Sequence, residues 1–463
     1  RSHPTFGDAR LSMVPKPTGG FRPIGVGSVV RRVALRIVAR QLAWDLREYL
    51  EVRGQVGHLQ AGPQRAFMRT QRCLTAGFGI LRLDIRNAFN EVTRTAVMNA
   101  ARRAGDALRR QHRPVDAIAA ACQAYASETV VRVTSSHHFA TRRGVIQGCP
   151  LGSLLYDLVQ ADIYPDLKEA LQPRGLSLLS MPRLGEDLLL PDNVVYIAAL
   201  HDDLTLASRS TSNMVTVVEA LQQLLSSRGL SLATDKAVLL STRAADPDTL
   251  RALQARPAAA TLFAGAPLHC PTLAGEQAAS NILHAKVTES LAAFARVIEL
   301  PDPQDQVKAL VLGGPWTRLQ YMFSLTAHLR VWDSLLDEAD RLSRSVLASA
   351  LGAHASEATP LTWAVALLPK ALGGLGIPSC VWEASVTSSR AYEALEALGP
   401  DAAAAVSSRA DRDRDAFHRS LQRLILAACD DDPIAIVRLR HAGRRASASP
   451  WLLAAAWHDG TLL

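Results

Sequence analysis

The pattern of apolar and polar positions divides the chain into two parts. Up to about residue 280, short apolar runs of strand length alternate with amphipathic helical segments. The pattern predicts a buried strand leading into a helix at 79–92, hairpins at 129–145 and 196–208, and a helix at 212–229 that ends at a glycine. Helices mixed with antiparallel hairpins are typical of the α+β class.

A basic row runs beside an apolar stripe in the predicted helix at 29–50. The stripe recurs at helical spacing and consists of Val30, Val33, Ile37, Leu42 and Leu46. The basic residues recur every four positions and are Arg32, Arg36 and Arg40. Two interpretations of these arginines stay open, a solvated helix face or contacts to the phosphates of a nucleic acid.

Only helical patterns follow after about residue 280. The predicted helices cover 280–299, 304–313, 315–329 and 331–352, and a last helical region rich in alanine covers about 380–463. The charge run at 409–419 is typical of a solvated helix face. We therefore expect a mixed N-terminal part and a helical C-terminal part.

Composition narrows the class of function only a little. The 463 residues predict two to four domains, and 48% hydrophobic with 20% charged residues is a globular composition. A formal net charge of +8 favours a polyanionic partner, nucleic acid first. The uncharged stretch at 257–275 contains three prolines, two glycines and a histidine, so it does not predict a membrane-spanning helix.

The cysteine spacing and the first residues of the chain predict its cellular compartment and its origin from a longer chain. The six cysteines show no CxxC or zinc-knuckle spacing, which is typical of reduced thiols in an intracellular protein. The chain begins with Arg-Ser-His rather than Met, so we expect an excised piece of a longer polypeptide without a signal peptide.

Three carboxylates are the candidate chemistry. Asp84 ends the predicted strand, and Asp202 and Asp203 lie side by side at the tip of the hairpin at 196–208. Each one alone is explained by a helix cap or a turn. Together they offer hard oxygen ligands, and two carboxylates about 4 Å apart repel by roughly 4 kcal/mol at an effective dielectric near 20. Because a divalent cation removes that repulsion, we predict a site for two-metal phosphoryl transfer.

Ordered motifs around these carboxylates resemble a known family. The segments LRLDIRNAFNEV, RRGVIQGCPLGSLLYDLV, ALHDDLTLAS and GLSLATDKAVLLST resemble the palm motifs of reverse transcriptases, and VPKPTGGFRPIGVGSVVRRV resembles the fingers motif before them. LPKALGGLGIPSC at 368–380 resembles a segment downstream of the polymerase core in non-LTR retrotransposons, and PLGSLL matches those elements better than group II intron enzymes. The resemblance spans roughly residues 11–390.

The resemblance implies metal-binding residues. Asp84 and Asp202 would be the principal ligands of two Mg²⁺ ions, with Mn²⁺ as an alternative. Asp203 would lie beside them, and the carbonyl of Ile85 would contribute. Phe89, five residues after Asp84, would be the steric gate that selects deoxynucleotides, with a core aromatic as the simpler interpretation.

The resemblance also implies substrate contacts. Gln147 and Gly148 would lie against the incoming nucleotide and the template, where a glycine lets the backbone approach closely. Arg22, with Lys16 assisting, would reach the triphosphate. Lys236 would be the general acid that protonates pyrophosphate, although a lone lysine is more often a solvated charge.

The implied architecture is a right-hand polymerase of the α+β class. Its expected parts are fingers at 1–80 with 105–143 contributing, a palm at 81–245, a connector at 246–279, a helical thumb at 280–352 and a helical C-terminal extension at 353–463.

The implied function is RNA-templated DNA synthesis in a non-LTR retrotransposon protein. The partners would be an RNA template, a DNA primer and deoxynucleoside triphosphates, and the location the nucleus. Leu200, Ile146 and Cys149 depart from the family pattern, so a decayed copy that only binds RNA stays open. An RNA-dependent RNA polymerase shares the aspartate pair, but Phe89 argues against it. A basic helical RNA-binding protein without catalysis is the third alternative. The sequence predicts no oligomeric state.

Overall fold

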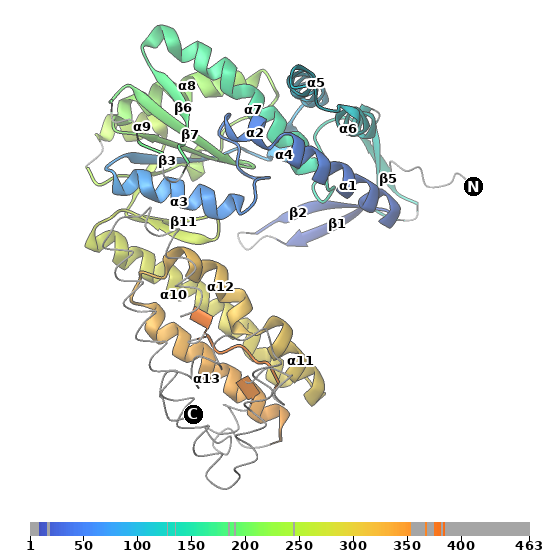
Figure 1. The fold of residues 1–463 in the computed structure, drawn as a ribbon, viewed down its shortest axis with the longest axis vertical. Helices are drawn as coiled ribbons and strands as arrows, with labels where there is room; N and C mark the ends of the chain where they lie inside the picture. The colour runs from blue at the N-terminus through green and yellow to red at the C-terminus, as the bar shows by residue number, and fades with distance from the viewer. Residues whose placement is uncertain are drawn as a thin grey trace, which may run out of the picture. The chain divides into compact units, whose positions relative to one another are not determined.

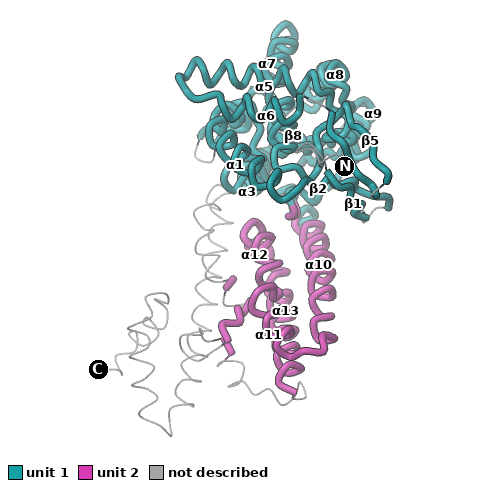
Figure 2. Tube along the Cα trace, turned by 90° about the vertical axis from the view of Figure 1, so that its right-hand side faces the viewer, with its two compact units in different colours: residues 1–264, 268–275 teal, residues 265–267, 276–463 magenta. Residues whose placement is uncertain are grey.

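The computed structural model shows two compact units (Figure 2). It describes residues 9–352, apart from 16–18, 127, 135, 184–185, 189–190 and 244–245, together with 366–367, 375–380 and 383–384. Unit 1 comprises residues 1–264 and 268–275, and unit 2 comprises 265–267 and 276–463. Most of the predicted C-terminal extension, including much of 368–380, lies outside the described residues.

A six-stranded sheet forms the centre of unit 1. Its order is β10 (Arg256–Ala258), β9 (Val238–Leu240), β3 (Gly79–Asp84), β8 (Asp203–Ser208), β7 (Val194–Leu200) and β6 (Ser177–Ser180). The central strands β3, β8 and β7 are antiparallel neighbours, which confirms the predicted hairpin at 196–208. Strand β9 is also antiparallel to β3, so β3 is bonded on both edges.

Helices cover both faces of this sheet (Figure 1). Helices α7 (Gly152–Leu171) and α8 (Thr211–Ser226) lie on one side, and α3 (Gly62–Thr75) lies on the other, against β3 and β7. Helix α5 (Arg94–Arg110) packs on α7. Leu81 and Leu83 of β3 join the core shared with α7 and α8. Because side chains alternate along a strand, Arg82 and Asp84 lie on the opposite face.

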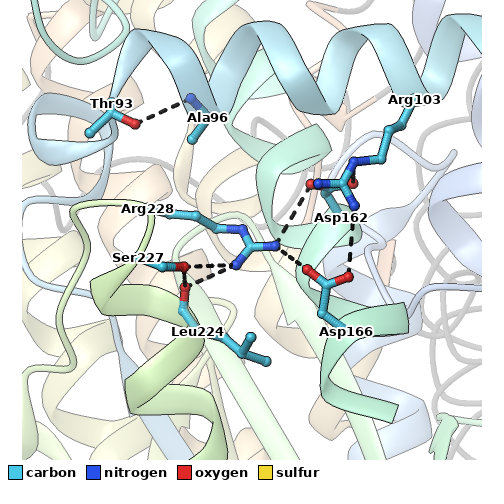
Figure 3. A network of polar contacts seen from close by, with 8 residues as sticks. All are labelled: Thr93, Ala96, Arg103, Asp162, Asp166, Leu224, Ser227 and Arg228. Carbon is cyan, nitrogen blue, oxygen red and sulfur yellow. Dashed lines mark hydrogen bonds and ion pairs between the residues drawn. The ribbon is translucent and has the colours of Figure 1, made fainter. Parts of the chain in front are cut away.

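Ion pairs connect α5, α7 and a residue just after the end of α8 (Figure 3). Arg228, just after α8, lies 3.8 Å from Asp162 of α7 and also pairs with Asp166, while Arg103 of α5 lies 3.1 Å from Asp162. Burial raises the pKa of Asp162, and the two arginines oppose that rise. The network therefore compensates a buried carboxylate with two cations.

A second sheet in unit 1 has the order β2 (Phe21–Gly27), β1 (Ala9–Pro15), β4 (Thr129–Arg132) and β5 (His138–Thr141). The antiparallel pair β4–β5 confirms the predicted hairpin at 129–145. Helix α1 (Val29–Asp45) follows β2 and contacts α6 (Asp116–Ala126). The described residues up to 269 also form the short helices α2 (Arg47–Glu51), α4 (Ala88–Glu91) and α9 (Pro247–Leu253). Two 3-10 helices (Gln172–Arg174 and Thr234–Lys236) and the hairpin β11 (Ala260–Phe263)–β12 (Ala266–His269) complete the elements in this range.

The first half of the apolar stripe predicted on α1 is exposed rather than packed against the core. Val30, Val33 and Ile37 are exposed by 72%, 57% and 65%. The helix instead buries Arg31 and Leu35 there, and Leu42 further along. The stripe gave the correct helical period, but the side of α1 that packs is set by its tertiary neighbours.

Unit 2 is helical. It contains α10 (Leu273–Ala295) from residue 276 on, α11 (Pro303–Gly313), α12 (Pro315–Thr326) and α13 (Trp332–Ala350). This confirms the four helical predictions, with α10 beginning seven residues before the predicted start at 280. Buried aromatic side chains join α12 and α13, because Phe323 and Trp332 pack edge to face at 5.2 Å. Trp332 also donates its indole N–H to Thr326 Oγ1 at 3.0 Å. No helix among the described residues is long and apolar enough to cross a membrane.

Candidate active site

The register of two strands brings the predicted carboxylates together. Asp84 ends β3 directly opposite Asp203, which begins β8, and directly opposite residues in an antiparallel pair point to the same face. Asp202 lies in the turn before Asp203, and its carbonyl accepts a hydrogen bond from the Ile85 N–H at 3.3 Å. Asp84 and the pair Asp202–Asp203, which are 118 or more positions apart in sequence, thus form one acidic cluster at the edge where β3 and β8 meet.

Two cations already neutralise part of this acidic cluster. Arg82 lies 3.1 Å from Asp203, and its guanidinium stacks over the Phe263 ring at 4.7 Å. The Lys236 ammonium donates to Asp84 Oδ2. The sequence argument that these carboxylates repel one another unless a metal is bound is therefore incomplete, because protein cations reduce the repulsion.

The remaining charges shift the pKa values of the cluster. Burial raises the pKa of Asp202, and the neighbouring Asp203 and Asp84 raise it further. Burial also raises the pKa of Asp203, against the opposing effect of Arg82. The hydrogen bond to Asp84 raises the pKa of Lys236, so this lysine is an ammonium at neutral pH. Any metal ion that bound at Asp84 would therefore compete with the Lys236 ammonium.

A cavity of about 490 Å³ contains several of the other predicted site residues. Phe89, Gln147 and Gly148 line it. The Phe89 ring packs against the buried Tyr156 at 5.0 Å, which fixes its position at the cavity wall. The basic row of α1 lines the same cavity and consists of Arg32, Arg36 and Arg40. The structure thus brings these arginines to the predicted nucleotide contacts.

The turn at Gln147 and Gly148 is built against strand β2. Gly25 donates its N–H to the Gln147 carbonyl at 2.8 Å. Gly148 has a φ of +102°, and a Cβ there would lie 2.8 Å from Ile24 Cγ2. A side chain at Gly148 is therefore disfavoured both by conformation and by contact.

The structure does not bring every predicted contact to this cavity. Arg22 is exposed on β2, opposite Val14, and does not line the cavity. Lys16 lies outside the described residues. Their predicted roles at the triphosphate remain predictions.

The sequence pattern missed Arg82 and a polar cluster next to the acidic one. Arg82 lies two residues before Asp84, and the strand period of two is the signal that places both on one face. The other cluster consists of His58, Asp157 and His201. No local signal could reveal it, because its members come from distant segments.

A second, larger cavity of about 1030 Å³ is basic. Its lining includes Trp44, which is 62% exposed and carries the Arg47 guanidinium 4.1 Å from its ring centre. The other arginines that line it are Arg40, Arg65, Arg69 and Arg183. Glu51 partly offsets them, since it lies 2.5 Å from Arg69.

Comparison with known proteins identifies the family. The family described as reverse transcriptase (RNA-dependent DNA polymerase) matches residues 14–274. A curated relative, the retrovirus-related Pol polyprotein from type-1 retrotransposable element R2 of Popillia japonica, is 26% identical over 250 residues, which are 51% of this chain and 32% of the relative. The chain thus spans about a third of that relative's length.

Among solved structures, the chain is similar to a telomerase and to a viral polymerase, each at low sequence identity. The telomerase of Candida albicans in complex with a TWJ fragment of telomeric RNA has a TM-score of 0.48 at 11% identity, over 94% of this chain and 64% of that chain. An RNA-dependent RNA polymerase of a human picobirnavirus has a TM-score of 0.42 at 13% identity, over 88% of this chain and 66% of that chain. The described residues combine helices with largely antiparallel sheets, as expected for the α+β class. The family match covers more than half of the chain, and the chain belongs to the reverse transcriptase family.

Proposed function

We propose that this chain catalyses RNA-templated DNA synthesis by two-metal nucleotidyl transfer. The observation that carries the proposal is the meeting of Asp84, Asp202 and Asp203 at one edge of the sheet in a chain of this family. In the reaction, the 3′-hydroxyl of a DNA primer attacks the α-phosphate of a deoxynucleoside triphosphate. The new phosphodiester forms as the bond to pyrophosphate breaks.

The acidic cluster fits the divalent metal ions that reverse transcriptases generally use. Carboxylate and carbonyl oxygens are the ligands that Mg²⁺ prefers, and Mn²⁺ accepts the same set. Asp84, Asp202 and Asp203 would hold two such ions, with the Ile85 carbonyl nearby. When bound, the ions would activate the primer hydroxyl and stabilise the charge of the leaving pyrophosphate.

Residues around the cluster would position the nucleotide. Phe89 would occupy the space below the sugar and exclude a 2′-hydroxyl, and its packing on Tyr156 supports a rigid gate. Gln147 and Gly148 would lie along the base pair. Arg22 and Lys16 would contact the triphosphate. Lys236 would protonate pyrophosphate once it has left Asp84.

The basic cavities would bind the nucleic acid strands. Arginines line both cavities, and Arg40 of α1 is common to them. Guanidinium groups bind backbone phosphates without regard to sequence. Trp44 offers an exposed ring on which a base can stack, next to the cation of Arg47. This arrangement supports an RNA template and a DNA primer as partners.

The curated relative supports a biological setting. We infer that the chain is the polymerase part of a non-LTR retrotransposon protein that acts in the nucleus, with a nicked genomic strand as the primer. Three positions depart from the family pattern, and the acidic cluster forms beside them: Leu200 pairs with Asp203 across the hairpin, Ile146 is buried against Gly25, and Cys149 lines the cavity of about 490 Å³. An inactive copy is therefore not favoured.

Primer extension on an RNA template tests the proposal. The purified full chain should extend a DNA primer with deoxynucleotides and Mg²⁺, and should discriminate against ribonucleotides. Asp202→Ala should abolish extension while RNA binding persists. Asp248→Asn removes an exposed carboxylate of α9 and should leave extension unchanged. Equal extension by Asp202→Ala, or none by the folded parent, contradicts the proposal.

A further inference from the structure

The polar cluster of His58, Asp157 and His201 joins three separate segments. His58 lies in the loop between α2 and α3, Asp157 lies in α7, and His201 lies in the turn between β7 and β8. His201 Nδ1 is 2.9 Å and His58 Nε2 is 3.2 Å from Asp157 Oδ2. One ligand atom from each of the three residues lies within 4.8 Å of the other two.

Two buried atoms of this cluster lack a hydrogen bond. The Asp157 side chain is 0% exposed, and its Oδ1 has no hydrogen-bond partner. His58 Nε2 is also without a hydrogen bond, although it is near the carboxylate. His201 Nδ1 is at hydrogen-bond distance from Asp157 Oδ2, but the unsatisfied Oδ1 of a fully buried carboxylate is unfavourable, and a bound cation is one way to compensate it. The cluster therefore combines two imidazoles with a buried carboxylate that has one unsatisfied oxygen.

The surrounding segments hold this cluster in place. Gly57 donates its N–H to Gln55 Oε1 at 2.9 Å, and Gln55 donates in turn to Gln160 Oε1 on α7 at 2.7 Å. A Cβ at Gly57 would lie 2.6 Å from His201 Nδ1 and 3.0 Å from Asp157 Oδ2. The loop thus reaches the two side chains so closely that only glycine fits, which preorganises the cluster.

We propose that His58, Asp157 and His201 bind one transition-metal ion of the Zn²⁺ class. Two imidazoles and a carboxylate are ligands that suit Zn²⁺, whereas Mg²⁺ prefers oxygen ligands alone. Bonds of about 2.0–2.2 Å in a tetrahedron separate ligand atoms by roughly 3.3 Å, and the 2.9 and 3.2 Å contacts to Asp157 Oδ2 are close to that spacing. Three protein ligands leave the fourth position to water.

This ion would act on the position of the catalytic turn. His201 directly precedes Asp202 and has a φ of +56°, a conformation that is uncommon for a residue with a side chain. A metal bound to His201 would tie the turn to α7 and to the loop at 52–61. The site is separate from the two catalytic ions in its residues and its ligand chemistry, and it goes beyond the proposed polymerase function.

Metal binding by the full chain, purified without a histidine tag and stripped by chelator, tests this site. Co²⁺ should give the visible absorption of tetrahedral coordination, and Zn²⁺ should displace it. Asp157→Asn and His58→Gln should each weaken this binding at least about tenfold, since each removes one of three ligands. His138→Gln, an exposed histidine of β5, and Asp84→Asn, in the acidic cluster, should keep it.

The outcomes separate this proposal from the polymerase proposal, because the readout is metal binding rather than synthesis. Absence of a tetrahedral Co²⁺ spectrum in the parent, or equal binding by parent and Asp157→Asn, overturns the site and leaves a hydrogen-bonded polar network. Circular dichroism establishes that each variant is folded. If both ligand variants are unfolded, thermal unfolding of the parent protein tests the site instead. Zn²⁺ should raise the midpoint temperature of unfolding of the parent, and an unchanged midpoint rejects the site.

Discussion

Replacing Lys236 by Met separates two effects of one side chain. In the structure, the Lys236 ammonium donates to Asp84 Oδ2, where a catalytic metal ion is expected. Methionine keeps a long unbranched side chain but has neither a charge nor a proton to donate. The variant should therefore bind Mg²⁺ more tightly and yet turn over more slowly.

The exposure of the pair sets the size of the first effect. The Lys236 side chain is 63% exposed and that of Asp84 is 21% exposed. Solvent-exposed ion pairs contribute about 0.2–1 kcal/mol, and a factor of ten in an equilibrium constant is about 1.4 kcal/mol. Loss of the competing ammonium should thus lower the Mg²⁺ concentration for half-maximal rate by at most about fivefold.

The role of Lys236 as general acid sets the second effect. General acid catalysis contributes roughly 10²- to 10⁴-fold, so the maximal rate at saturating Mg²⁺ should fall about 100-fold or more. Single-turnover primer extension over a range of Mg²⁺ concentrations measures both quantities. Lys308→Met is the matched control, because Lys308 is also 63% exposed and pairs with Asp305 at 3.0 Å on α11.

Two results would refute this reasoning. A half-saturating Mg²⁺ concentration that is unchanged or higher in Lys236→Met would show that the ammonium does not compete with the metal. An unchanged maximal rate would show that Lys236 is not the general acid. Lys308→Met should match the parent in both quantities, since it lies outside the site.

Three further substitutions test other parts of the structure. Phe89→Ala should raise the ratio of kcat/KM for ribonucleotides to kcat/KM for deoxynucleotides by at least about tenfold. An unchanged ratio would mean that Phe89 is a core aromatic residue and not the steric gate. Arg228→Met should lower the free energy of unfolding by about 3 kcal/mol, because the negative charges of the buried Asp162 and the partly exposed Asp166 lose one of their cations. Urea denaturation measures this change, and a loss under about 0.5 kcal/mol would count against the network. Arg36→Ala should reduce the slope of log affinity for RNA against log salt by about one if Arg36 contacts a phosphate.

The local sequence pattern determined much of the polymerase core. Strand β3 could be predicted because its apolar run ends at Asp84, and the hairpin at 196–208 because two apolar runs flank Asp202 and Asp203. The four helices of unit 2 could be predicted from their periodicity. Each of these elements is formed by residues that are close together in sequence. The local pattern therefore contains the information needed to predict it.

Only the tertiary structure decided what these elements face. The register of β3 on β8 placed Asp84 opposite Asp203, and the same packing brought Lys236 to Asp84 across 152 positions of sequence. Helix α1 had the predicted period but buried Arg31 rather than Val30. A period fixes which residues share a face, whereas the neighbouring elements decide which face is buried. For the same reason, no local pattern could join His58, Asp157 and His201, which meet only after the loop, α7 and the hairpin have packed together.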